Sequence, residues 1–200
     1  GKPWTMDAIM ALKMISDPQI SPDGSKVAYV VRSVNFQRKG YDSQIWVVST
    51  SGGTPEPLKS SHASDGRPRW SRKGNQLAFV SRRDGPSQIY VIAPPDGQPR
   101  KLSATATGVG DFKWSPDDSH IGYLAVDALS AEEKKRIQEG EDPIVANQGY
   151  RYSRLYQVST SSGPEQRLTT SDRHVASFDW APDGKKVVYS GQITPRSRDT

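Results

Sequence analysis

The sequence predicts an all-β protein, a partial β-propeller of four-stranded antiparallel blades, and three observations lead to this fold class. A tight-turn tetrapeptide, Ser-Pro-Asp-Gly at residues 21–24, returns in altered form at residues 71–74, 115–118 and 181–184. A run of β-forming residues follows each copy. Successive copies begin 50, 44 and 66 residues apart, and a period of about 40–50 residues with four strands per unit is typical of propeller blades.

The tetrapeptide has the chemistry of a tight turn. Serine opens the turn, proline presets φ at the second position, aspartate bonds to the local backbone and glycine accepts a positive φ. The segment before the turn ends in Trp70, Trp114 and Trp180 in the later three copies and in Ile20 in the first. We therefore expect each turn to join the first strand of a blade to the second, at residues 27–31, 77–81, 121–125 and 187–191.

The second half of each unit repeats as well. Third strands are expected at residues 44–48, 88–92 and 154–158, and short fourth segments at 56–58, 100–102 and 166–169. Unbroken apolar runs fit strands that are covered on both faces. A single strand follows the last turn, so we expect about three blades and part of a fourth, an incomplete ring that belongs to a longer protein.

Two segments differ from the repeat near the N-terminus. Residues 5–15 have helical spacing at Met6, Ile9, Met10 and Lys13, and a proline at residue 18 disfavours helix just before it. We expect residues 1–18 to form an N-terminal helix and lead-in, and residues 19–200 to form the blades. Residues 32–43 are expected to form a long polar hairpin loop in the first blade.

The third unit contains an insertion at residues 127–150, which explains its longer interval. Ser130 and Glu133 form a capping box, Lys135 and Glu139 are spaced as i,i+4 partners, and Gly140 is placed to end a helix. Loops of this length in compact domains are usually functional or disordered, and this one has marked local structure. It is the first place to search for a functional site.

Composition narrows the function classes. There is no run of 18 apolar residues and no cysteine, so we expect no membrane span, disulfide or thiol site. The net charge of +5 comes from basic residues spread over turns, and we expect no nucleic-acid partner. No spaced metal ligands or phosphate-binding glycine loop occur, so no metal or cofactor is expected. A cytoplasmic and a periplasmic location both remain open.

The Trp-Ser-Pro-Asp-Gly hairpins, the Ile-Trp/Tyr-Val strands and the Gly-Gly-x-Pro-x-x-Leu turn resemble the propeller repeats of two groups. These are the prolyl oligopeptidase family of serine peptidases and the TolB-like proteins. The lead-in to residues 17–24 and the insertion at residues 127–150 are similar to the acylaminoacyl-peptidase and dipeptidyl-peptidase branch of the first group. The resemblance extends over nearly all 200 residues.

The resemblance to the peptidases implies a separate C-terminal α/β-hydrolase domain, with its serine on a Gly-x-Ser-x-Gly turn. This sequence has no such turn; residues 85–89 are similar but lack the final glycine. His62, His120 and His174 fall in or beside turns, where solvated histidines are expected. No catalytic residue is therefore assigned, and the expected function is a non-catalytic, substrate-gating propeller of a peptidase that hydrolyses short peptides. The alternative is a TolB-like module that binds a protein.

Six residues of the insertion region are candidates for substrate binding. Glu132 and Glu133 resemble the glutamates with which some dipeptidyl peptidases hold a peptide amine, although first-turn glutamates also stabilise a helix by themselves. Tyr150, Arg151, Tyr152 and Arg154 form an aromatic and guanidinium cluster that suits a peptide carboxylate or carbonyl; the alternative is that the tyrosines pack the blade edge. The expected partners are a peptide substrate and, through the open propeller edge, a second copy of the chain.

Overall fold

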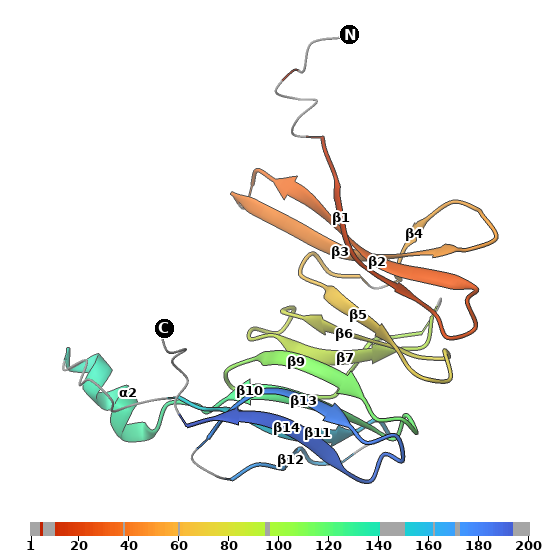
Figure 1. The fold of residues 1–200 in the computed structure, drawn as a ribbon. Helices are drawn as coiled ribbons and strands as arrows, with labels where there is room; N and C mark the ends of the chain where they lie inside the picture. The colour runs from red at the N-terminus through yellow and green to blue at the C-terminus, as the bar shows by residue number, and fades with distance from the viewer. Residues whose placement is uncertain are drawn as a thin grey trace, which may run out of the picture. The chain divides into compact units, whose positions relative to one another are not determined.

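The computed structural model describes residues 5, 11–37, 39–59, 61–94, 97–140, 151–161, 163–170 and 173–193, and their regular structure is β-strand apart from one short helix (Figure 1). Three four-stranded antiparallel sheets and one hairpin follow one another along the chain. Blade 1 contains β1 (Met14–Ile20), β2 (Lys26–Asn35), β3 (Gly40–Ser49) and β4 (Glu56–Pro57). Blade 2 contains β5 (Gly66–Trp70), β6 (Leu77–Ser81), β7 (Gln88–Ile92) and β8 (Arg100–Lys101).

Blade 3 contains β9 (Val109–Trp114), β10 (His120–Val126), β11 (Ser153–Ser159) and β12 (Gln166–Arg167), and α2 (Ala131–Gln138) lies between β10 and β11. The fourth sheet is the hairpin of β13 (His174–Trp180) and β14 (Val187–Gln192). In every blade each strand pairs with the next along the chain. The predicted all-β partial propeller of four-stranded antiparallel blades is thus confirmed.

The chain forms two compact units, Gly1–Leu102 and Ser103–Thr200. The first contains blades 1 and 2, and the second contains blade 3 and the β13–β14 hairpin.

The repeated tetrapeptide forms the turn between the first two strands of each blade. In blade 1 the amide of Gly24 donates to the carbonyl of Ser21 at 2.8 Å, and Gly24 has a φ of 71°, which suits glycine. The hydroxyl of Ser21 donates to Asp23 at 2.6 Å and accepts from the amide of Lys26. The Ser21 hydroxyl, followed by contacts from Ser25, holds the pKa of Asp23 down to about 2. The turn is therefore fixed by its own side chains.

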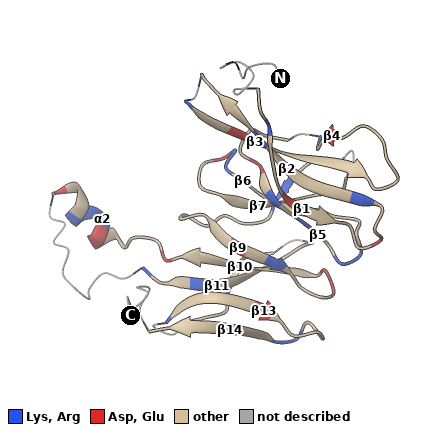
Figure 2. Cartoon of the chain, turned by 45° about the horizontal axis from the view of Figure 1, so that its top comes forward, with Lys and Arg blue, Asp and Glu red and all other residues tan. Residues whose placement is uncertain are grey.

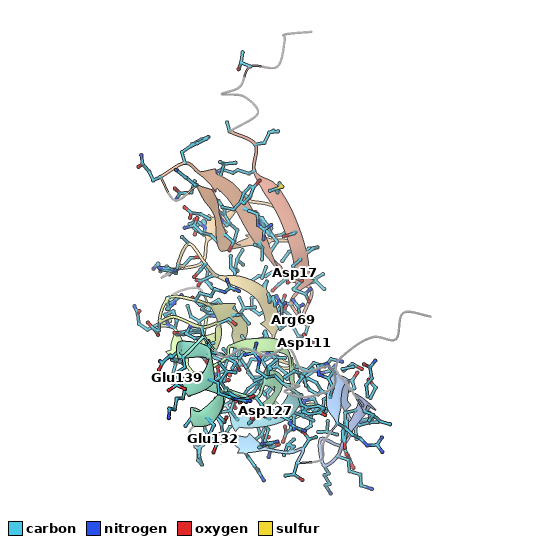
Figure 3. The ribbon with its side chains drawn as sticks, turned by 90° about the vertical axis from the view of Figure 1, so that its left-hand side faces the viewer. Asp17, Arg69, Asp111, Asp127, Glu132 and Glu139 are labelled. Carbon is cyan, nitrogen blue, oxygen red and sulfur yellow. The ribbon has the colours of Figure 1, made fainter. Side chains whose placement is uncertain are left out.

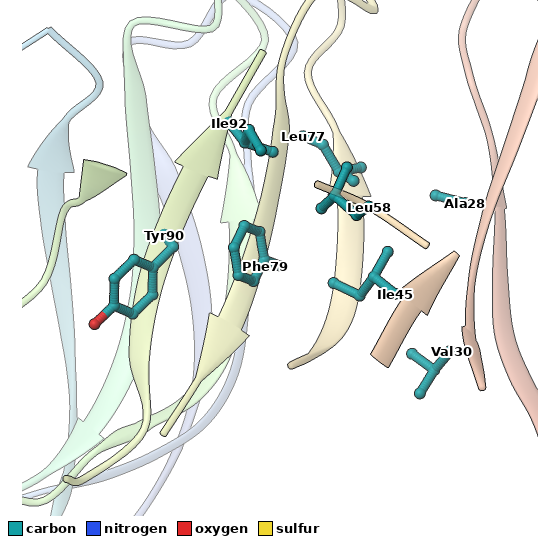
Figure 4. Packing of buried hydrophobic residues seen from close by; sticks show 8 residues of the cluster. All are labelled: Ala28, Val30, Ile45, Leu58, Leu77, Phe79, Tyr90 and Ile92. Atoms are coloured by element: carbon teal, nitrogen blue, oxygen red, sulfur yellow. The ribbon is translucent and has the colours of Figure 1, made fainter. Parts of the chain in front are cut away.

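The core of the first unit lies between blades 1 and 2 (Figure 4). Side chains from the middle strands of both blades form it, together with Leu58 after β4, and all are at most 7% exposed: Ala28, Val30, Ile45, Leu58, Leu77, Phe79, Tyr90 and Ile92. Phe79 and Tyr90 stack with their ring centroids 5.8 Å apart. One face of the blade 1 sheet is therefore covered by blade 2.

Blade 3 packs against the β13–β14 hairpin in the same way within the second unit. Leu124 and Leu155 from blade 3 form a buried cluster with Val175 and Phe178 from β13. Gly122 in β10 permits this approach, since a Cβ at that position would lie 2.8 Å from the ring of Phe178. A larger residue there would push the hairpin away from blade 3.

Two predictions about blade 1 need correction. Residues 6–10 of the expected helix at residues 5–15 lie outside the described residues, but Met14 and Ile15, at its end, lie in β1 and pair with Arg32 and Val31. The helix therefore does not extend to residue 15, because pairing with a distant strand overrides local helical spacing.

The long polar loop predicted at residues 32–43 is also mostly strand. β2 continues to Asn35 and β3 begins at Gly40, with Val34 opposite Tyr41. The side-chain amide of Asn35 donates to the carboxylate of Asp42 at 2.7 Å and joins the two strands near their tip. Polar side chains that can bond across a hairpin are compatible with strand pairing, which the composition did not reveal.

A tryptophan at the end of the first strand connects neighbouring blades. In the first unit, the indole N–H of Trp70 (β5) donates to the carbonyl of Gln19 (β1) at 3.0 Å. In the second, the indole of Trp180 (β13) donates to the carbonyl of Lys113 (β9) at 3.3 Å. The two contacts occupy equivalent positions, so this tryptophan is a repeated link between one first strand and the next.

An ion pair accompanies each tryptophan contact. Arg69 lies 2.9 Å from Asp17 in the first unit (Figure 3), and Lys113 lies 3.0 Å from Asp179 in the second. Both pairs are partly exposed, so each contributes at most about 1 kcal/mol. The tryptophan contact, with its ring against the core, contributes more to the association of the blades.

We predict that Trp70→Phe lowers the free energy of unfolding by about 1 kcal/mol more than Trp46→Phe does, measured by urea titration. Trp70→Phe leaves the Gln19 carbonyl without its indole donor. The indole N–H of Trp46 is buried and has no described hydrogen-bond partner, so Trp46→Phe is the matched control. Equal midpoints for the two variants would contradict a stabilising role for the Trp70 contact.

Candidate functional site

The insertion leaves blade 3 after β10 and returns at the start of β11. The amide of Asp127 donates to the carbonyl of Tyr152 at 2.9 Å, so the two ends of the insertion are held together. Tyr150, one of the predicted site residues, lies outside the described residues, as do residues 141–149. The described part contains α2 and five of the six predicted site residues.

The predicted capping box of α2 is confirmed. The amide of Glu133 donates to the hydroxyl of Ser130 at 3.1 Å, and the carboxylate of Glu133 accepts from the amide of Ser130 at 2.7 Å. These bonds, together with the charges of Arg136 and Arg151, lower the pKa of Glu133. Lys135 and Glu139 form the expected i,i+4 pair at 3.8 Å. The helix is thus stabilised by its own caps and pairs.

None of the residues of α2 is buried, and Ile137 is 51% exposed. The acidic side chains Glu132 and Glu133 lie in its first turn, and the basic side chains Lys135 and Arg136 lie in its last turn (Figure 2). Glu132 is exposed in its first turn (Figure 3), whereas the carboxylate of Glu133 is engaged in the cap. Glu132 is therefore the member of the predicted pair that is better placed to meet a peptide amine, and its role stays a prediction.

Arg154 is buried, with 4% of its surface exposed, and holds the base of the insertion. Its Nε donates to the carboxylate of Asp127 at 2.7 Å, and its Nη1 donates to the carbonyl of Arg173 at 3.3 Å. The guanidinium lies 4.8 Å from the ring centroid of Tyr152. Arg154 and Tyr152 thus contact each other within blade 3, and their role in substrate binding stays a prediction.

Arg151 is exposed and contributes to the low pKa of Glu133, so these two predicted site residues lie close enough for their charges to interact. Arg151 and Glu132 are thus the exposed members of the described set. Arg151 and Tyr152 lie directly before β11 and Arg154 lies in it, so these three residues are neighbours along the chain. Glu133 of α2 is linked to them by the charge interaction with Arg151.

Sequence reasoning missed three residues of this region. Asp127 accepts from Arg154 and also lies 3.8 Å from Arg167. His174, expected as a solvated turn residue, lies in β13, and its Nδ1 accepts from the amide of Ser153 at 3.2 Å. The position of Asp127 directly after a strand was visible in the sequence, but its partners lie 27 and 40 residues further along, so only the pairing of strands brings them together. We call the set Asp127, Tyr152, Arg154 and Arg167 the insertion root.

Blade 2 has a polar cluster at the corresponding end of its strands. Arg83 lies 2.9 Å from the fully buried Asp65 and 4.8 Å from the ring centroid of Tyr90. The hydroxyl of Tyr90 donates to Asp84. Burial, followed by the bond to Asp84, raises the pKa of Tyr90 to about 12. The tyrosine therefore stays protonated and acts as a hydrogen-bond donor.

Other site types were sought among the described residues. No group of three or more His, Cys, Asp or Glu side chains there could hold a metal ion. A cavity of about 470 Å³ lies in the first unit, lined by Lys26 of β2, residues of β3 and β4, the neighbouring turns and Pro94, and none of the predicted site residues lines it. No helix in the described part of the chain is long and apolar enough to cross a membrane.

We predict that Asp127→Ala lowers the free energy of unfolding by about 3 kcal/mol, because it leaves the buried guanidinium of Arg154 without its counter-charge. Glu139→Ala removes the exposed pair with Lys135 and is the matched control, with an expected loss below about 0.5 kcal/mol. Urea titration of both variants tests this. A loss for Asp127→Ala no larger than that of the control would show that the insertion root adds no stability.

Comparisons with known proteins place these features in a family. The profile of the TolB beta propeller domain, PD40, matches residues 8–149. The uncharacterized peptidase YuxL of Bacillus subtilis is 33% identical over 205 aligned residues, which cover 95% of this chain and 31% of YuxL. The chain thus spans about a third of the length of this relative.

Solved structures show the same fold at low identity. The uncomplexed acylaminoacyl peptidase of Pyrococcus horikoshii has a TM-score of 0.66 and 18% identity, over 94% of this chain and 29% of that one. TolB of Acinetobacter baumannii has a TM-score of 0.58 and 22% identity, over 88% and 37% of the two chains. The resemblance inferred from the turn repeats is confirmed, and the chain belongs to the TolB beta propeller domain family, PD40.

Proposed function

We propose that this chain is the non-catalytic, substrate-gating propeller of a serine peptidase that hydrolyses short peptides, with the catalytic groups on a C-terminal α/β-hydrolase domain. The observation that carries the proposal is the similarity to the peptidase YuxL, which extends over 95% of this chain and only 31% of that protein. The remaining length of such a protein is ample for a catalytic domain of typical size.

The chemistry of the proposed reaction is acyl transfer. A serine oxygen attacks the peptide carbonyl, the amine leaves with a proton from a histidine, and water then hydrolyses the acyl-enzyme. In the proposed protein the propeller restricts access to the catalytic domain by substrate size, and it positions one end of the peptide. The internally bonded polar clusters of blades 2 and 3 suit a rigid frame for such tasks.

The second candidate is a TolB-like module that binds a protein and catalyses nothing. The family profile and the structural similarity to TolB support it. The two candidates differ in what the rest of the polypeptide must supply. A peptidase needs a Gly-x-Ser-x-Gly turn followed by an aspartate and a histidine, and a binding module needs none of these.

We predict that the full-length protein hydrolyses a short chromogenic peptide and reacts with a serine-directed phosphonate, whereas the purified 200-residue chain does neither. The expected substrates are peptides, with folded proteins left intact because they cannot pass the propeller. Replacement of the serine in the Gly-x-Ser-x-Gly turn by alanine is the control and should abolish hydrolysis. Hydrolysis by the 200-residue chain itself, or none by the full-length protein, would refute the proposal.

We also propose that the isolated chain self-associates through the edge of β14. In the described part of the chain β14 pairs with β13 alone, and Val188 and Tyr189 are 67% and 42% exposed. Exposed strand edges with apolar side chains favour association. Light scattering is expected to show a mass above that of a monomer, which Val188→Lys should reduce; a strictly monomeric chain would exclude this contact.

A further inference from the structure

The β2–β3 hairpin of blade 1 extends beyond the end of blade 2. When the turns at Ser21 and Ser71 are aligned, residues 27–31 of β2 correspond to β6 (Leu77–Ser81), the whole second strand of blade 2. β2 continues for four more residues to Asn35, and β3 begins four residues before Gln44, the counterpart of Gln88. This end of the hairpin has no counterpart in blade 2.

The face of the hairpin that covers blade 2 therefore continues past it. Ala28 and Val30 lie on the covered face and pack in the core cluster. Side chains alternate along a strand, so Arg32 and Val34 lie on the same face. Met14 is paired with Arg32, and Tyr41 is paired with Val34. These four residues, Met14, Arg32, Val34 and Tyr41, are here called the hairpin ledge.

The ledge is exposed and apolar. Met14 is 48% exposed, Val34 37% and Tyr41 61%, and Phe36 at the tip of the hairpin is 58% exposed. Methionine, aromatic residues and arginine are the residue types enriched where proteins bind one another. Single exposed apolar residues need no explanation, but a group of them on one sheet face indicates a binding surface.

The ledge also has a positive charge. The guanidinium of Arg32 lies 5.7 Å from the ring centroid of Tyr41, and among the described residues Arg32 forms no ion pair. The acidic residue of these strands, Asp42, is paired with Ser33 on the opposite face and accepts from Asn35. A guanidinium stacked on an aromatic ring is well suited to bind a carboxylate.

We propose that the hairpin ledge binds a short, extended peptide segment in which an acidic side chain lies among apolar ones. This inference rests on the proposed function and names the class of peptide that the propeller would hold. Along β2 the ledge extends over residues 32–35, a length of about 10 Å at roughly 3.3 Å per residue. This length fits about three residues of an extended peptide. A stable interface between folded proteins needs about 800 Å² from each partner, more than this ledge provides.

The test uses two probes that differ only in charge, acetyl-Leu-Glu-Leu-amide and acetyl-Leu-Lys-Leu-amide. Each is titrated into the 15N-labelled 200-residue chain while the amide resonances of residues 32–35 and 40–42 are followed. The acidic probe is expected to shift these resonances and to bind roughly fivefold more tightly than the basic probe, the size of one solvent-exposed charge interaction. Absence of shifts at these residues, or equal affinity for both probes, would overturn the proposal.

Two variants test separately the charge of Arg32 and the aromatic ring of Tyr41. Arg32→Gln should abolish the preference for the acidic probe, and Tyr41→Ser should weaken binding of both probes. Val188→Ser, in the exposed strand β14, is the control and should change neither. Unchanged probe affinities for Arg32→Gln and Tyr41→Ser would refute the ledge as the site. If Tyr41→Ser instead lowered the oligomeric mass, the ledge would be a contact between copies and the proposal would be wrong.

The peptidase proposal can fail independently of this one. Binding of the acidic probe by the 200-residue chain needs no hydrolysis, so it supports the ledge even if the full-length protein proves inactive. Conversely, a full-length peptidase whose KM ratio for acidic and basic peptides is unchanged by Arg32→Gln would retain the proposed function and exclude the ledge.

Discussion

Within each unit, the structure depends on the burial of one sheet face by the neighbouring sheet. An antiparallel sheet of four short strands has too little apolar contact to be stable alone, because a few strands bury little area on one face. In the first unit Val30 and Ile45 from blade 1 meet Phe79 and Ile92 from blade 2. In the second, Gly122 leaves the space that Phe178 fills. The side chains between neighbouring sheets thus form the core of each unit.

The regular parts of the chain serve this packing. In the first and third turns the serine and the aspartate both accept hydrogen bonds from the local backbone, so the first and second strands meet in a fixed register. The tryptophan at the end of the first strand then bonds to the preceding blade. One short repeat therefore specifies both the hairpin within a blade and a contact with its neighbour, which is how a repeat architecture grows along the chain.

The candidate functional features occur where the repeat is interrupted. In the insertion root, Arg154 is buried against Asp127 and Tyr152. The two ends of the insertion are therefore held at one fixed position in blade 3. The hairpin ledge is present because blade 1 has longer middle strands than blade 2. In both places the regular blades supply rigidity and the irregular segment supplies exposed side chains. This arrangement is common in proteins that position ligands on loops above a stable scaffold.

The sequence by itself determined the turns, the middle strands and the caps of α2. These features depend on residues close in the chain: Asp23 bonds to Ser21 and Ser25, and Glu133 bonds to Ser130. Hydrogen bonds between residues so close in sequence can be predicted from a few consecutive residues. Strands β6 and β7 were accordingly predicted at their observed bounds, since apolar runs between turns mark them clearly.

Only the tertiary structure decided where blade 1 begins, how far its hairpin extends and what Arg154 does. Met14 and Ile15 lie at the end of the segment predicted to be helical, but they form strand because β2 offers them pairing partners 16 or more residues away. Arg154 is buried because Asp127, Tyr152 and the Arg173 carbonyl surround it after strand pairing. Such outcomes depend on contacts between residues far apart in sequence, and their energies exceed the local preferences that a sequence pattern records.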